Sequence, residues 1–167
     1  FNEQLTIAAT ERIQLESELR YALNNNQLEI YFQPLVNIYN AETAGAEALL
    51  RWRHPRKGLL LPDAFLSVAE ETGLIETIDQ WVLIETCRQG HTWLNQGFHL
   101  KSLAVNISGY ELHHSDFAAR VARILEQQDF PAHKLTLEFN ERALMERELE
   151  TYDILTTLSN MGIKLAI

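Results

Sequence analysis

The regular exchange of strand-like and helix-like segments constrains the fold of this chain more than any other feature. Segments rich in β-branched, aromatic and apolar residues cover 28–38, 44–52, 100–108, 134–141 and 163–167. Helical patterns cover 2–25, 62–73, 74–97, 115–128 and 142–162. Strands that alternate with helices of this length indicate a parallel sheet, and the hairpin-like first pair adds an antiparallel strand. We therefore expect an α/β fold with about five strands, which fits an open doubly wound sheet or the first part of an eight-stranded barrel.

Composition narrows the class of protein. The chain has 167 residues, of which 46% are hydrophobic, so it can form a domain with a real core. A formal net charge of −9 argues against general affinity for nucleic acid, and we expect no DNA partner. The single cysteine, Cys87, excludes an intrachain disulfide and fits a reducing, cytoplasmic compartment. No apolar run approaches the roughly 20 residues that cross a bilayer. This does not exclude a membrane anchor elsewhere in a parent protein.

One carboxylate interrupts the second strand-like segment. Glu47 lies in the middle of "AGAEALLRW", residues 44–52, which is otherwise so apolar that we expect burial on both faces. An unpaired buried charge costs several kcal/mol, so Glu47 needs a partner. That partner is either an arginine, Arg51 or Arg53, or a metal ion.

Two more polar residues occupy similar positions in later strands. Asn106 ends the apolar run "LAVNIS", and Glu138 lies in "LTLEFNE". Parallel strands bring their carboxyl ends to one edge of the sheet, so we expect Glu47, Asn106 and Glu138 to meet there. Two carboxylates and an amide oxygen are the ligand set of Mg²⁺, Mn²⁺ or Ca²⁺. Taken singly, an ion-paired Glu47 and an Asn106 that caps a loop are the more common explanations; the three residues taken together support a metal site equally well.

These stretches resemble the motifs of one family. "AGAEALLRWRHP" resembles the signature of EAL-domain cyclic di-GMP phosphodiesterases, whose name is spelled by residues 47–49. "LEIYFQPLV", "LLPDAFLSVAEETGLI", "LAVNIS" and "LTLEFNE" resemble further family segments in the same order and spacing. The resemblance extends from Leu15 to Ile167. It implies bacterial second-messenger signalling and a modified TIM (β/α)₈ barrel with an antiparallel first strand, here incomplete.

The resemblance also implies an activity and its residues. Such enzymes hydrolyse cyclic di-GMP to linear pGpG with Mg²⁺ or Mn²⁺, by attack of a metal-activated water on phosphorus. The implied metal ligands are Glu47, Asn106 and Glu138, and Glu47 with Glu141 would be catalytic. Glu141, which would steady a loop near the metals, fits equally well as a helix N-terminal charge. The implied substrate contacts are Gln33, Leu49, Arg51 and Pro62, of which Leu49 and Pro62 fit core packing and loop rigidity as well.

The sequence departs from the family pattern in two places. Asn140 stands where the family usually has Thr, and the pair of aspartates that the family carries next would follow Ile167. We therefore expect the 167-residue chain alone to be inactive. The alternatives are a degenerate EAL domain that acts as a cyclic di-GMP receptor or binds a protein partner, and a generic α/β domain with an ion-paired Glu47.

The family resemblance also implies how the chain is divided into segments. Residues 1–26 would form a connector and the first helix, and residues 27–167 the N-terminal part of an EAL domain that stops before the Asp-Asp loop. The start, "FNEQL", resembles the join after a GGDEF-type domain, so a GGDEF-type or sensor domain is expected upstream in the parent protein. Open strand edges would favour a homodimer.

Overall fold

The computed structural model of the chain describes residues 2–141 and 148–167. The helices are α1 (Asn2–Asn24), η1 (Pro62–Ala64), α2 (Leu66–Thr72), α3 (Leu74–Asn95), η2 (Gly109–His113), α4 (Phe117–Gln127), η3 (Ala132–Lys134) and α6 (Glu148–Asn160), where η marks a 3₁₀ helix. The strands are β1 (Leu28–Val36), β2 (Thr43–His54), β3 (Gly58–Leu60), β4 (Ser102–Ile107), β5 (Leu135–Phe139) and β6 (Lys164–Ala166). The chain divides into two compact units: Phe1–Glu29 with Leu50–Ile78, and Ile30–Leu49 with Asp79–Ile167.

The sheet combines one antiparallel pair with a parallel series. Its strand order is β1-β2-β4-β5-β6, and β1 and β2 run antiparallel. The pairs β2–β4, β4–β5 and β5–β6 are parallel. This confirms the expected α/β fold, a partial TIM-like barrel. The short strand β3, which pairs antiparallel with β2 through Trp52 and Leu60, was not expected. Gly58, at φ +75°, lets the chain turn back there, in a stretch whose sequence predicts only a loop.

In the first unit, α1 packs with α2 around the end of β2. Trp52 and Phe65 are fully buried and meet edge to face, with ring centroids 5.5 Å apart. The indole nitrogen of Trp52 donates to Oε1 of Gln27 at 3.3 Å. Leu19 of α1 is also fully buried. Helix α1 therefore provides core contacts inside this unit.

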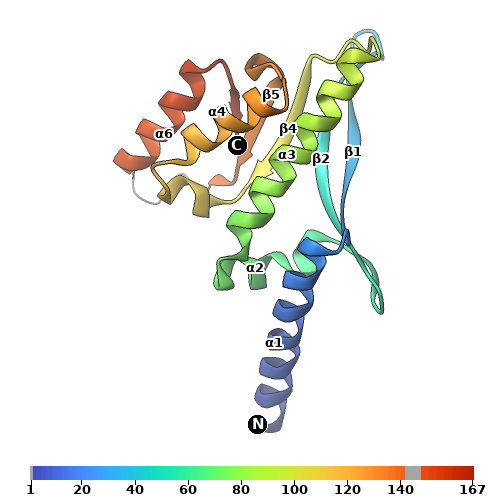
Figure 1. The fold of residues 1–167 in the computed structure, drawn as a ribbon, viewed down its shortest axis with the longest axis vertical. Helices are drawn as coiled ribbons and strands as arrows, with labels where there is room; N and C mark the ends of the chain where they lie inside the picture. Colours follow the sequence, from blue (N-terminus) through green and yellow to red (C-terminus); the bar gives the residue numbers. More distant parts are fainter. Residues whose placement is uncertain (1, 142–147) are drawn as a thin grey trace. The chain divides into compact units, whose positions relative to one another are not determined.

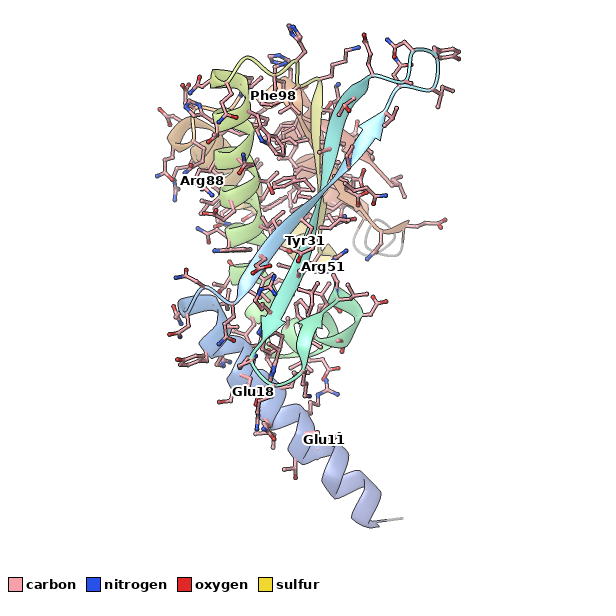
Figure 2. The ribbon with its side chains drawn as sticks, turned by 90° about the vertical axis from the view of Figure 1, so that its right-hand side faces the viewer. Glu11, Glu18, Tyr31, Arg51, Arg88 and Phe98 are labelled. Carbon is pink, nitrogen blue, oxygen red and sulfur yellow. The ribbon has the colours of Figure 1, made fainter. Side chains whose placement is uncertain are left out.

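A buried histidine ties α1 to the end of β2. Nε2 of His54 lies 2.8 Å from Oε2 of Glu18, and Arg56 pairs with the same carboxylate. Nδ1 of His54 accepts from the backbone N–H groups of Arg56 and Lys57, both at 3.1 Å, so the ring proton must lie on Nε2. These bonds lower the pKa of Glu18 to about 2, chiefly through the bond to His54. Figure 2 shows Glu18 on α1 beside the turn that follows β2.

In the second unit, the core is formed by buried apolar residues of the central strands and of helix α4. The central positions Leu103, Val105, Leu135 and Leu137 are fully buried. Helix α4, in the segment where the sequence predicts a helix, contributes a buried face made of Phe117, Val121, Ile124 and Leu125. Figure 1 shows α4 and α6 side by side next to β5. The apolar face of α4 and the buried apolar residues of β4 and β5 thus stabilise the parallel part of the sheet.

The burial of β2 differs from the expectation. Its side chains alternate between buried positions, among them Ala46 and Ala48, and half-buried ones, among them Glu47 and Leu49. The expectation of burial on both faces was therefore wrong. Because successive side chains of a strand point to opposite faces, Glu47 shares its face with the other half-buried residues and is only partly withdrawn from water.

Candidate functional site

Three polar side chains predicted to meet are carried by neighbouring parallel strands. Glu47 belongs to β2, Asn106 to β4 and Glu138 to β5. Asn106 is the register partner of Glu138, and Glu47 is the partner of Ala104, two residues before Asn106. In parallel strands this register places all three side chains on one face of the sheet. The sheet therefore brings together the residues whose convergence the sequence predicts.

A hydrogen bond links two of these residues, Asn106 and Glu47. Nδ2 of Asn106 donates to Oε1 of Glu47 at 2.8 Å. Because this bond uses the amide nitrogen, the amide oxygen Oδ1 remains as an acceptor at the same place. The atom of Asn106 that could bind a cation is therefore Oδ1.

The third residue, Glu138, interacts electrostatically with Glu47. The pKa of Glu138 is raised from its ordinary value, first by partial burial and then by the negative charge of Glu47. A cation between the two carboxylates would remove that repulsion. Two carboxylates and an amide oxygen suit a hard divalent cation. In the part of the chain that the structure describes, no cluster of three or more His, Cys, Asp or Glu side chains is placed to hold a metal, so a metal here would depend on the amide as well.

The arginines suggested as partners of Glu47 make other bonds. Arg53 donates to both oxygens of Glu29, at 2.6 and 2.9 Å. Nη1 of Arg51 donates to the backbone oxygen of Leu50 at 2.8 Å. The ion pair of Arg53 is therefore with Glu29, inside the first unit. Glu47 accepts a hydrogen bond from Asn106.

The remaining candidates lie in both units. In the second unit Gln33 is exposed on β1, Leu49 is half-buried on β2, and Glu141 is exposed just after β5. In the first unit Arg51 is half-buried on β2 and Pro62 is the first residue of η1. The helix predicted over 142–162 lies partly outside the described residues, which resume with α6 at Glu148.

One polar contact next to this site was not predicted. Asp79 of α3 is 5% exposed, and its Oδ2 accepts from the backbone N–H and from the hydroxyl of Ser108, at 3.0 and 2.6 Å. Ser108 follows β4 directly, two residues after Asn106. A signal was present, because Asp79 interrupts the buried apolar series of Ile75, Ile78 and Val82 on α3.

Comparison with known families decides the membership of the chain. The family model described as "EAL domain" matches residues 16–167. The chain belongs to the EAL-domain family. This confirms the resemblance found in the sequence motifs, which started at nearly the same residue.

Similarity to individual proteins supports membership of the EAL-domain family. The chain is 39% identical over 167 residues to "Cyclic di-GMP phosphodiesterase NbdA" of Pseudomonas aeruginosa, covering all of this chain and 21% of that protein. It is 34% identical over the same length to "Oxygen sensor protein DosP" of Escherichia coli, covering 21% of it. It superimposes with a TM-score of 0.88 on "PaMucR Phosphodiesterase, c-di-GMP complex", at 40% identity, covering 92% of this chain and 62% of that one.

The length of these relatives sets the scope of the comparison. This EAL chain spans between a fifth and a quarter of the curated relatives named first. One of them is a "Bifunctional diguanylate cyclase/cyclic di-GMP phosphodiesterase", MucR of P. aeruginosa. A helix long and apolar enough to cross a membrane is not found within residues 2–141 and 148–167.

Proposed function

We propose that this chain is part of a Mg²⁺- or Mn²⁺-dependent phosphodiesterase that hydrolyses cyclic di-GMP to linear pGpG. The observation that carries the proposal is the convergence of Glu47, Asn106 and Glu138 on one face of neighbouring parallel strands. The names of two EAL relatives, NbdA and PaMucR, support the choice of substrate.

Each of these three side chains has a defined task in the proposal. Glu47 and Glu138 supply negative charge, and the bond from Nδ2 of Asn106 orients one carboxylate of that pair. The Oδ1 atom of Asn106 adds a neutral oxygen donor. A bound Mg²⁺ or Mn²⁺ would lower the pKa of a water ligand and stabilise charge on the phosphoryl oxygens. Holding that cation by three rigid strands, and not by loops, would keep the donor atoms in place.

The other candidates have roles that follow from the family resemblance. Glu141, just after β5, would steady the segment that follows it near the metals. Arg51 suits a phosphate or a guanine edge, because its guanidinium donates in a planar fork. Gln33, Leu49 and Pro62 would contact the nucleotide.

A receptor without catalysis is the second candidate. The observation that favours it is Asn140, which stands between the last residue of β5 and Glu141 where the family usually has Thr. In that case the protein would bind cyclic di-GMP or a partner protein and release it unchanged.

The experiment compares turnover and binding in the complete protein to which this chain belongs. Purified protein is incubated with cyclic di-GMP and Mn²⁺ or Mg²⁺, and pGpG is measured by chromatography. Glu47→Gln and Glu138→Gln should each lower turnover by at least about 100-fold, since each removes a charged metal ligand. Glu42→Gln, an exposed carboxylate just before β2, is the matched control and should leave turnover unchanged.

Calorimetry with cyclic di-GMP distinguishes the outcomes. Binding without pGpG release would replace the phosphodiesterase proposal with the receptor. Neither binding nor release would contradict both proposals.

A further inference from the structure

We propose that Asp79 is a positioning residue for Asn106 and acts through Ser108. The inference rests on the proposed function, because it assumes that Asn106 is a metal ligand. It adds a residue from helix α3 to a site that otherwise consists of strand residues.

The first argument is the geometry of the anchor. Oδ2 of Asp79 accepts two bonds from one residue, the backbone N–H of Ser108 at 3.0 Å and its hydroxyl at 2.6 Å. Hydrogen bonds to an ionised carboxylate are shorter and stronger than neutral ones. Two such bonds hold both the backbone and the side chain of Ser108. The residue that follows β4 is therefore tied to α3 at two points.

The second argument is the distance along the chain from the anchor to the ligand atom. Only Ile107, which is 4% exposed, separates Ser108 from Asn106. The side chain of Asn106 is itself exposed, so packing does little to set its rotamer. Its direction depends on the backbone at the end of β4 and on the bond to Glu47. An anchor at Ser108 sets that backbone.

The third argument is a contrast between the two ends of β4. At the start of the strand, Ser102 meets Thr136 through a neutral hydroxyl pair at 2.7 Å. At the end that carries Asn106, the partner is a carboxylate that is 5% exposed among apolar residues of α3. Burying a carboxylate costs more than burying a hydroxyl. The costlier anchor stands at the end where side-chain position matters.

The test uses Mn²⁺ binding by the complete protein, measured by calorimetry, together with urea unfolding. Ser108→Ala removes the hydroxyl and keeps the fold-forming backbone bond. It should weaken Mn²⁺ binding about 10-fold, as changes in groups behind a metal ligand do. Ser102→Ala is the matched control: the same substitution at the first residue of β4, whereas Ser108 directly follows its last residue. It should lower stability comparably and change the Mn²⁺ dissociation constant less than twofold. Ser108→Thr, which keeps the hydroxyl, should restore binding.

A double-mutant cycle separates this inference from the proposed function. If Ser108 acts through Asn106, then Ser108→Ala should not weaken Mn²⁺ binding further in an Asn106→Ala background. An Asn106→Ala protein with unchanged Mn²⁺ affinity would overturn the proposed metal site itself. An Asn106→Ala protein with weakened affinity, combined with a Ser108→Ala protein that behaves like Ser102→Ala, would overturn only the positioning role.

Variants of Asp79 itself test the positioning role independently. Asp79→Asn keeps an oxygen that accepts both bonds but loses the charge, so Mn²⁺ binding should weaken less than in Asp79→Ala. In the metal-free protein, Asp79→Ala should also shift the NMR signals of the Asn106 side-chain amide. Unchanged amide signals in a folded Asp79→Ala protein would contradict the proposal.

Discussion

Asn106 donates a hydrogen bond from Nδ2 to Oε1 of Glu47 across two parallel strands, at 2.8 Å. The bond joins residues 59 positions apart in the sequence. It orients a carboxylate that also interacts with Glu138, whose pKa is raised in part by the charge of Glu47. Small changes in charge at these three positions should therefore have opposite effects on stability and on cation binding.

Replacing the amide by a third carboxylate tests this balance. Asn106→Asp loses the Nδ2 donor and places a negative charge beside Glu47. We expect the metal-free protein to lose about 1 kcal/mol of stability at pH 7. Saturating Mn²⁺ should raise its melting temperature by more than it raises that of the unmodified protein, because a ligand that binds the native state stabilises it.

The matched control for this variant is Asn40→Asp. Nδ2 of Asn40 donates to Oε2 of Glu42 at 2.8 Å in the turn between β1 and β2, so the local chemistry is the same. Its response to Mn²⁺ should equal that of the unmodified protein. Equal responses of the two variants would argue against a cation site at Asn106.

Neutralising Glu138 should stabilise the protein while removing its function. Glu138→Gln removes the repulsion from Glu47, so we expect a metal-free gain of a few tenths to about 1 kcal/mol at pH 7. Because the folded pKa of Glu138 is raised, the native state binds more protons than the unfolded state above pH 4.5. Stability of the unmodified protein should thus fall as pH rises from 4.5 through that folded pKa.

Urea unfolding at several pH values measures both effects. The Glu138→Gln protein should lack this component of the pH dependence, and Mn²⁺ should no longer raise its melting temperature. A less stable Glu138→Gln protein would show that Glu138 makes a favourable native contact and not a repulsive one.

The link between α1 and β2 has the opposite pH dependence. His54 and Arg56 lower the pKa of Glu18 from 4.5 to about 2. The stabilisation is therefore complete above about pH 4.5 and is lost as pH falls toward 2. Because Glu18 is partly solvated, we expect Glu18→Gln to cost about 1–2 kcal/mol at pH 7 and to flatten the pH dependence between 4.5 and 2.

Glu16→Gln is the control on the same helix. Glu16 pairs with Arg20 at 2.9 Å on an exposed surface, and such a pair contributes only about 0.3–0.5 kcal/mol. Acid titration followed by circular dichroism would measure both variants. The role assigned to Glu18 would be refuted if the two variants had the same stability and the same acid slope.

Close packing of α3 on β4 should make Gly90 intolerant of a side chain. A Cβ atom at Gly90 would lie 2.5 Å from Cε2 of Phe130 and 2.7 Å from Cδ1 of Leu103. Both neighbours are buried, so we expect Gly90→Ala to cost about 1–3 kcal/mol although Ala favours helix formation. Gln80→Ala, an exposed position of α3, should be near neutral. Urea midpoints of the two variants compare them, and a stabilised Gly90→Ala protein would show that the neighbours yield.

Local periodicity explains how much of the fold the sequence predicts. Apolar residues at helical spacing placed α1 and α4, and apolar or alternating segments placed β1, β2, β4, β5 and β6, since both signals depend on near neighbours in the chain. Strand β3 was missed because three residues after a turn carry no periodic pattern. Residues 47, 106 and 138 were recognisable because a polar side chain inside an apolar, strand-like segment stands out.

The sequence alone therefore determined the order of helices and strands, the family, and which oxygen-bearing residues are candidates for a cation site. Only the tertiary structure decided that Asn106 bonds diagonally to Glu47 while it lies opposite Glu138, and that Asp79 of α3 holds the residue at the end of β4. The physical reason is that register and helix docking are set by packing between segments distant in the chain, which leaves no periodic trace in either segment.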